Sequence, residues 1–222
     1  MHNQFLSKQN ISKLEKLLLQ FVNSQEDYLS VRSLDDPRSV GSALQSLVED
    51  NFQIIVSNPE LEFQTNFTRR GMADIAFSDA DNVNYIIDVK THNLDTAFSM
   101  PNLTANRRLV DLYKTDKLQP ENYFMVLIFA YRIIDSKLIV EKVIFTPVEN
   151  LDWECLTIGA LGWGQIQIKN SNKIKLNLEL TRKEWMLQLC DKMIIFYPKE
   201  ITKIKERVKY FEDARDFWNL KI

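Results

Sequence analysis

The chain has few of the residues that build common metal and redox sites. It contains two histidines, too few for a histidine-rich metal centre, and two cysteines, Cys155 and Cys190, whose separation matches no zinc or redox motif. We therefore expect buried thiols in a reducing compartment, which places the protein in the cytoplasm. No apolar run approaches membrane-spanning length and the N-terminus lacks a signal peptide's apolar core, so we expect no membrane partner.

Glycine is scarce too, and three of the five glycines lie in the segment 159–164. This segment lacks the lysine and the strand-to-helix setting of a phosphate-binding loop, so a nucleotide cradle is not expected. Close approach to DNA or tight sheet packing would each explain the glycines. The net charge of −2 counts against a binder that holds DNA by charge alone, although lysine and arginine cluster at 69–70, 107–117 and 169–175.

The apolar pattern predicts alternating helices and strands without a linker or repeat. Helical periodicity is expected over 11–21, 40–52, 104–118 and 181–196, with Pro198 breaking the chain before a last helix over 200–218. Strands are expected over 61–67, 72–77, 85–90, 123–133, 138–145, 165–169 and 174–178. The order predicts one α/β domain over residues 1–222, with a central mixed sheet flanked by helices.

Two carboxylates and a lysine lie in the hairpin expected over 72–90. Side chains alternate along a strand, so Asp88 and Lys90 point to one face while Ile87 and Val89 point to the other. Antiparallel pairing brings Asp74 beside Asp88. Two such carboxylates form a hard oxygen site suited to Mg²⁺, and a nearby lysine can hold a water or a phosphate oxygen. An exposed hairpin with ordinary surface charges is the alternative, but charges within an apolar strand are costly unless they are paired or metal-bound.

This pattern resembles the active-site motif of the PD-(D/E)xK nuclease superfamily, with Ala73 where a proline is usual. Within it, the chain resembles type II restriction endonucleases, in particular the HincII group and more distantly the EcoRV group. Four segments over about 70–190 carry the likeness, in the same order: Asp88-Val89-Lys90-Thr91-His92-Asn93, Pro101-Asn102, Gly164-Gln165-Ile166-Gln167-Ile168 and Thr181-Arg182-Lys183-Glu184-Trp185.

The resemblance implies a restriction-endonuclease-like fold and a homodimer that cuts double-stranded DNA with Mg²⁺ at a short, palindromic site, leaving blunt ends. It also implies a cognate DNA methyltransferase as a functional partner. Asp74 and Asp88 would ligate the metal with the main-chain carbonyl of Val89, and Lys90 would orient or help deprotonate the attacking water and offset charge on the phosphorane. The upstream acid that the family places on a helix is open between Gln45 and Glu49.

Residues that would contact DNA are polar and lie near the expected cleft. His92 is expected to be a surface residue or a support for the site rather than a catalyst. Thr91 and Asn93 are expected to contact phosphate. Base contacts are expected on one side of the groove from Asn102, Thr104, Asn106 and Arg107, and on the other side from Gln165, Gln167, Asn170, Ser171 and Asn172. For Asn170, Ser171 and Asn172, good turn chemistry is an equal alternative.

Two other functions use the same residues. A DNA-repair or junction-resolving nuclease of the superfamily would keep Asp74, Asp88 and Lys90 but read the shape of DNA. A non-catalytic DNA-binding or protein-interaction module would keep the fold without cleavage. The complete set of two aspartates and a lysine favours an enzyme over the last of these.

Overall fold

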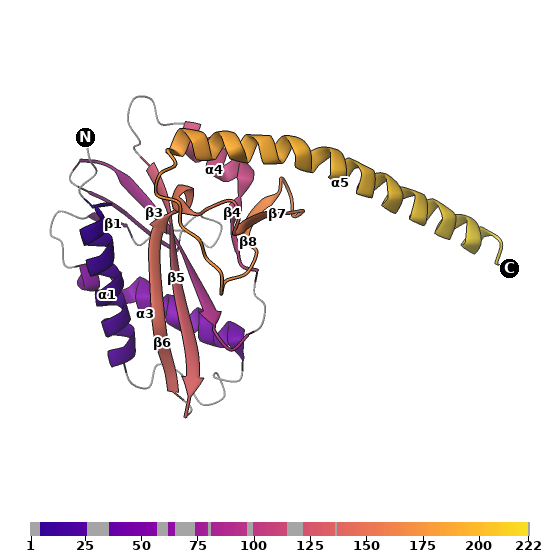
Figure 1. Ribbon diagram of the computed structural model, residues 1–222. Helices are drawn as coiled ribbons and strands as arrows, with labels where there is room; N and C mark the ends of the chain where they lie inside the picture. The colour runs from indigo at the N-terminus through magenta and orange to yellow at the C-terminus, as the bar shows by residue number, and fades with distance from the viewer. Residues whose placement is uncertain are drawn as a thin grey trace.

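A five-stranded mixed sheet forms the centre of the protein (Figure 1). The computed structural model describes residues 5–25, 36–56, 62–64, 74–79, 81–96, 100–114, 122–135 and 137–221. The sheet order is β1 (Glu62–Gln64), β2 (Ile75–Ser78), β3 (Asn84–Asn93), β5 (Asn122–Ile134) and β6 (Lys137–Pro147). β3 and β5 are parallel and the other neighbours antiparallel. The expected α/β class and mixed sheet are confirmed.

Two helices cover one face of this sheet. α1 (Lys8–Ser24) begins at Ser7, whose side chain accepts a hydrogen bond from the Asn10 amide, and α3 (Pro37–Val56) follows it. Their apolar residues recur every three or four positions, as in an amphipathic helix, and bury one stripe of each helix against the sheet. We call this the first apolar cluster.

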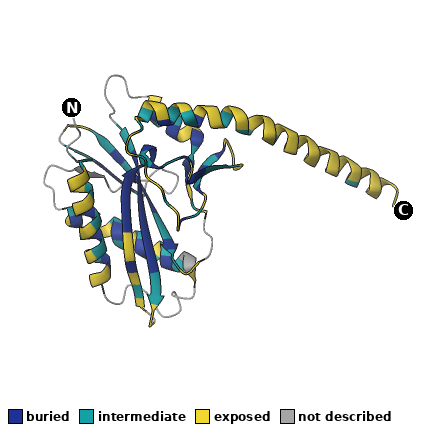
Figure 2. Cartoon of the chain, in the orientation of Figure 1, coloured by how far each residue is buried: buried dark blue, intermediate teal, exposed yellow. Residues whose placement is uncertain are grey.

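A second, three-stranded sheet lies over the other face. Its order is β4 (Asn102–Ala105), β8 (Gln165–Ile168) and β7 (Leu156–Gly159). With α4 (Asn106–Lys114), the 3₁₀ turn η1 (Val148–Asn150) and the start of α5 (Arg182–Asn219), it encloses the second apolar cluster. Because both faces are covered, β5 is buried along most of its length (Figure 2). Leu127 and Phe129 belong to the first cluster, and Val126 and Ile128 to the second.

Several expected boundaries are wrong. Pro198 does not break the last helix, because α5 is continuous through it and bends only gently (Figure 1). Proline removes the donor to the Ile194 carbonyl, but Ile194 is 70% exposed and water can bond to that carbonyl. The strand expected over 174–178 is reduced to a single bridge between Leu176 and Leu151. Residues 102–105 form β4, and 156–159 form β7, which was not expected. No helix among the described residues has the length and apolarity to cross a membrane.

A buried polar network ties α4, β5, η1 and α5 together. The Tyr113 hydroxyl donates to Glu149 Oε2 at 2.7 Å and accepts from the Phe124 amide at 3.2 Å. Arg182 Nε donates to Glu149 Oε1 at 2.9 Å, and its guanidinium lies 4.2 Å from the Tyr113 ring centroid. Burial, followed by the charge of Glu149, raises the pKa of Tyr113 well above its ordinary value. The tyrosine therefore stays a neutral donor.

Replacing Tyr113 with phenylalanine should destabilise the fold. The variant keeps the ring but leaves Glu149 Oε2 and the Phe124 amide without this partner, which costs about 1–3 kcal/mol for buried groups. Urea denaturation of Tyr113→Phe and the parent measures the difference in free energy of unfolding. The matched control is Tyr210→Phe, at a residue that is 69% exposed, which should stay within about 0.5 kcal/mol of the parent. Equal losses in both variants would show that the network adds no stability.

Candidate functional site

The two aspartates meet where the β2–β3 hairpin opens. Ile75 pairs with Ile87, and the Asp74 amide donates to the Ile87 carbonyl at 2.9 Å. Asp74 therefore lies opposite Asp88, one residue before β2 begins. The predicted hairpin and this juxtaposition are confirmed for 74–79 and 81–90, whereas Met72 and Ala73 lie outside the described residues.

The Asp74 side chain accepts the hydrogen bond from β3 that the backbone of a further β2 residue would otherwise accept. Its Oδ2 accepts a hydrogen bond from the Val89 amide at 2.6 Å. The N–H and C=O of a strand residue point towards the same neighbour, so the Val89 carbonyl also faces the Asp74 side. Lys90 Nζ lies 3.4 Å from that carbonyl. Two carboxylates and a main-chain oxygen are thus presented around the end of β2.

Asp88 is a charged group in an apolar setting. Only 8% of the residue is exposed, and Lys90 Nζ donates to its Oδ1 at 2.7 Å. Its Oδ2 is buried and has no hydrogen-bond partner among the described residues. Burial raises the pKa of Asp88 to about 7, with Lys90 opposing the rise and the charge of Asp74 adding to it. The carboxylate therefore has an oxygen available and is stabilised by positive charge.

Glu49 is the helical acid whose charge reaches this centre. Burial raises its pKa, a hydrogen bond from Gln45 lowers it, and the negative charges of Asp74 and Asp50 raise it again. Gln45 Nε2 donates to Glu49 Oε1 at 2.7 Å. The structure therefore favours Glu49 over Gln45 as the upstream acid, with Gln45 holding its carboxylate.

A glycine lets α3 approach β3. A Cβ atom built on Gly41 would lie 2.9 Å from Thr91 Oγ1, closer than real Cβ contacts allow. Gly41 therefore permits the close packing that carries Glu49 towards the end of β2. Thr91 faces α3 here, on the opposite side of β3 from Asp88 and Lys90, and this packing occupies a residue that was expected to contact phosphate.

His92 is a buried link between the two sheets rather than a surface residue. It is 3% exposed, and its Nε2 lies 2.7 Å from Asn172 Oδ1. Asn172 Nδ2 in turn donates to the Thr96 carbonyl at 3.2 Å, and its main-chain amide donates to Asn170 Oδ1 at 2.9 Å. The expected surface location of His92 is wrong, while its expected supporting role remains a prediction. Turn chemistry accounts for the Asn170 side chain, whereas the Asn172 side chain joins His92 to the Thr96 carbonyl.

Members of both groups of expected DNA contacts lie side by side on the small sheet, so Asn102 and Gln167 are neighbours rather than on opposite sides of a groove. β4 pairs with β8, and Gln167 Nε2 donates to Asn102 Oδ1 at 2.6 Å across the pair. Thr104 and Ser171 are buried, and the Asn93 carboxamide accepts from the Asp95 amide. The sequence separation of β4 and β8 hid their pairing. Gln165 and Gln167 are partly exposed and Asn102 is exposed, which leaves one polar surface for ligand contact.

Arg107 and Trp163 form a neighbouring exposed pair that the residue pattern did not indicate. The guanidinium of Arg107 lies 4.8 Å from the Trp163 ring centroid and 3.5 Å from Asp111. Gly164, at φ +86°, packs its backbone so closely on Asn106 that a Cβ would meet Nδ2 at 2.6 Å. Tight packing is thus sufficient to explain this glycine. Arg69, Arg70 and Lys117 lie outside the described residues.

The donors fit a hard divalent cation that keeps ligands other than protein. In the described part of the chain, no three His, Cys, Asp or Glu side chains converge on one metal position. Mg²⁺ commonly binds through one or two carboxylates, with waters and substrate phosphates completing its shell. Asp88 Oδ2, a buried oxygen without a described partner, and Asp74 next to it match that requirement.

The burial of Asp88 predicts a specific pH dependence of stability. Its pKa is about 7 in the folded protein and 3.8 ordinarily, so the folded state binds more protons between these values. Stability should fall as pH rises from about 4 to about 7, by up to about 4 kcal/mol from this group. Asp88→Asn should lack this component and gain stability over the parent above pH 7.

Urea denaturation in EDTA from pH 4 to 8 checks this for the metal-free protein. Asp213→Asn, at an exposed carboxylate on α5, is the control and should keep the parent's pH dependence. If Asp88→Asn followed the same curve as the parent, the carboxyl would not be a desolvated acid.

Comparison with known proteins assigns no family. No protein-family model matches the chain, and the search of curated proteins gave no match. The function must therefore be argued from the geometry of the site.

Proposed function

We propose that the protein is a metal-dependent endonuclease that hydrolyses phosphodiester bonds in double-stranded DNA. One observation carries the proposal: the buried Asp88 carboxylate stands opposite Asp74 and beside Lys90, with one oxygen lacking a described partner. A desolvated acid of this kind is unfavourable in a purely structural sheet and favourable where a cation binds. The charge of Glu49 adds to the same centre.

The sequence supports the finer assignment to a type II restriction endonuclease. The four resembling segments fall on β3, at the start of β4, on β8 and at the start of α5. The mixed sheet between helices is compatible with a restriction-endonuclease-like fold. We therefore propose a homodimer that cuts a short palindromic site, as a two-fold protein presents the same surface to both half-sites, with a methyltransferase protecting the host DNA.

Asp74 and Asp88 would hold Mg²⁺, with the Val89 carbonyl as the third protein oxygen. The bound ion would supply Lewis acidity and a water of lowered pKa. In the structure, Lys90 Nζ contacts Asp88 Oδ1 and lies near the Val89 carbonyl. The ammonium therefore lies beside the oxygens that would hold the ion.

Lys90 would act on the attacking water and on the phosphate. The Lys90 side chain is 23% exposed, so its ammonium can turn from Asp88 towards a bound phosphodiester. There it would orient the water and offset the negative charge that develops on the phosphoryl oxygens. Asp74 would hold the backbone of β3 through the Val89 amide, which keeps Asp88 and Lys90 at the end of β2.

DNA contacts would come from the exposed part of the small sheet and from α4. Gln167 and Asn102 carry side-chain amides that can pair with adenine. Arg107 carries a guanidinium group that can form two hydrogen bonds with guanine or phosphate. Asn102 and Gln167 face each other across β4 and β8, and Arg107 lies in the first turn of α4, which follows β4 directly.

Digestion of a sequenced plasmid with Mg²⁺ tests the function directly. We expect discrete fragments whose sequenced ends give the site and the end type. Asp88→Ala should abolish cleavage, since it removes the buried carboxylate, and Mg²⁺ should raise the melting temperature of the parent but not of this variant. Asp213→Ala, at an exposed acid, is the control and should cut normally.

Other outcomes contradict parts of this proposal. A smear or cleavage of branched DNA alone would indicate a repair or junction-resolving nuclease. Binding of DNA without cleavage under any Mg²⁺ condition would indicate a non-catalytic module. Near-normal cleavage by Asp88→Ala would refute the assigned metal site.

Lys90 should serve the chemistry more than the binding of DNA. Lys90→Ala removes the one described cation paired with Asp88, and we expect single-turnover cleavage in Mg²⁺ to slow at least about 100-fold. Affinity for cognate DNA in Ca²⁺ should fall less than about 10-fold, because other phosphate and base contacts remain. Lys173→Ala, at an exposed lysine of the 169–175 cluster, is the control for loss of charge alone. A loss of affinity as large as the loss of rate would make Lys90 a docking residue.

A further inference from the structure

The second half of α5 leaves the body of the protein. Figure 1 shows it projecting away from both sheets, and Figure 2 shows its residues exposed almost without exception beyond Pro198. Many of those residues are large and apolar: Ile201, Ile204, Val208, Tyr210, Phe211, Phe217, Trp218 and Leu220. A solvated single helix of this kind would expose far more apolar surface than a soluble monomer normally carries.

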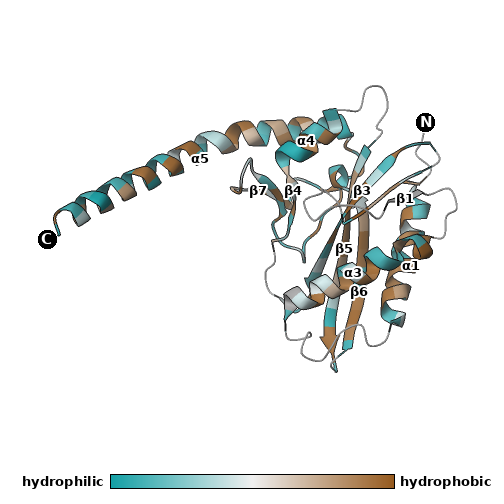
Figure 3. Ribbon diagram, turned by 180° about the vertical axis from the view of Figure 1, so that it is seen from behind, coloured by the Kyte–Doolittle hydropathy of each residue, from teal (hydrophilic) through white to brown (hydrophobic). Residues whose placement is uncertain are grey.

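The apolar residues follow a heptad repeat. Ile201 and Val208 take the a positions, seven residues apart, and Ile204, Phe211 and Trp218 take the d positions between and after them. The alternating spacing of three and four residues places them on one stripe, which is the seam of a coiled coil. Figure 3 shows apolar and polar residues alternating along this part of α5. We call Ile201, Ile204, Val208, Phe211 and Trp218 the α5 seam.

The a and d series continues back along the helix, where Leu187 is 55%, Ile194 70% and Tyr197 38% exposed. Cys190 and Tyr197, which occupy d positions, line a cavity of about 370 Å³ together with α4 and Trp163. The Tyr197 hydroxyl donates to the Trp163 carbonyl at 3.0 Å. Trp185 and Leu189, which bury the start of α5 against the body, lie outside the a and d series, and no described residue covers the α5 seam.

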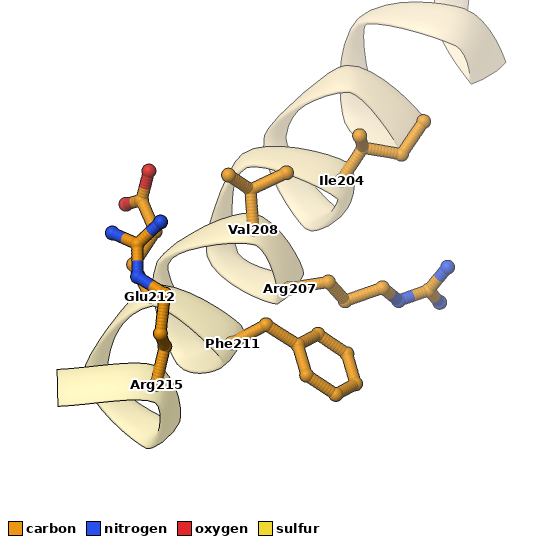
Figure 4. Close-up of a pocket in the computed structure, with 6 residues that line it drawn as sticks. All are labelled: Ile204, Arg207, Val208, Phe211, Glu212 and Arg215. Carbon is orange, nitrogen blue, oxygen red and sulfur yellow. The ribbon is translucent and has the colours of Figure 1, made fainter. Parts of the chain in front are cut away.

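The seam is shaped as holes for incoming side chains. Figure 4 shows a shallow groove lined by Ile204, Arg207, Val208, Phe211, Glu212 and Arg215. The first four occupy consecutive d, g, a and d positions, which is the set that receives an a side chain of a parallel partner. Val208, Phe211, Glu212 and Arg215 form the next hole, which receives a d side chain.

The charges beside the seam favour pairing with a second copy of the chain whose helix runs in the parallel direction. In a parallel pair, each g position faces the e position of the partner's next heptad. Arg207 would then face the partner's Glu212, and Glu200, whose Oε1 accepts from Lys203 at 2.7 Å within the helix, would lie near the partner's Lys205. Each pair occurs twice by symmetry, and all join opposite charges.

We propose that the α5 seam pairs with the same seam of a second copy in a parallel, in-register, two-stranded coiled coil over about residues 200–219. Arg215 is the polar a position that would fix the register near its end, with Asp216 beside it at 3.8 Å. The inference gives the homodimer of the proposed function an interface. It stands on α5 alone, so a molecular mass and a cleavage assay test the two proposals separately.

Light scattering on the full chain during size-exclusion chromatography tests the seam. The parent should elute with twice the 26.1 kDa mass of the chain. Val208→Glu puts two carboxylates into the seam and should weaken dimerisation at least about 100-fold. Thr202→Glu adds the same charge at a b position on the outer face and should leave the dimer unchanged. Unaltered far-UV circular dichroism would show that both variants fold.

A charge exchange tests the direction of the helices. Arg207→Glu alone creates two like-charge pairs and should weaken the dimer about 10-fold, as should Glu212→Arg alone. The double variant restores opposite charges only in a parallel, in-register pair and should recover the parent's dissociation constant.

Three results would overturn the proposal. A parent that is monomeric at all concentrations would show that the seam does not pair. A dimer indifferent to Val208→Glu would place the interface elsewhere. Failure of the double variant to recover would exclude the parallel register.

Discussion

The buried Asp88 carboxylate is the constraint on which the rest of the structure depends. An ionised group on a covered strand is unfavourable unless opposite charge compensates it. Lys90 on the same face supplies part of that charge. Ile87 and Val89, on the opposite face, lock β3 into the first apolar cluster, so the strand cannot turn its acid outwards. The fold therefore holds a destabilised carboxylate in place, which is the arrangement expected of a binding centre rather than of a structural element.

Strand β5, helix α3 and the turn that contains Asn172 all contact β3 around Asp88. Parallel pairing with β5 sets Asp88 level with Val126 in the middle of the sheet. Gly41 lets α3 pack against Thr91, so the helix that carries Glu49 reaches the site from the other face. His92 continues the Asp88 face outwards and joins the small sheet through Asn172. The acidic centre and the polar surface of β4 and β8 are thereby parts of one framework, and a ligand that spans them would meet a preorganised surface.

The part of the site that depends on local pattern was predictable. Two-residue alternation along β3 put Asp88 and Lys90 together, and turn residues after Phe77 set the hairpin that brings Asp74 alongside. The rest depended on how distant elements dock. Gln45 and Glu49 lie one turn apart on the same face of α3, so periodicity could not choose between them. The pairing of Asn102 with Gln167 joins residues far apart in sequence, and no local rule predicts it. Pro198 misled because the helix around it is solvated and tolerates the missing hydrogen bond.

The anchoring of α5 connects its free half to the five-stranded sheet. Trp185 is fully buried, stacks on Trp153 and donates to the Leu151 carbonyl at 2.8 Å. One turn earlier, Arg182 joins the network of Glu149 and Tyr113, and Tyr113 accepts from the amide of Phe124 on β5. The hydrogen bonds among these steps are buried or part-buried, and such bonds are unfavourable to break individually. The direction in which α5 leaves the body is therefore fixed relative to β5 and its neighbour β3. If two α5 helices pair, the separation of the two Asp88 centres follows from this rigid connection rather than from a flexible linker. The packing within each chain would therefore set the relative position of the two protomers.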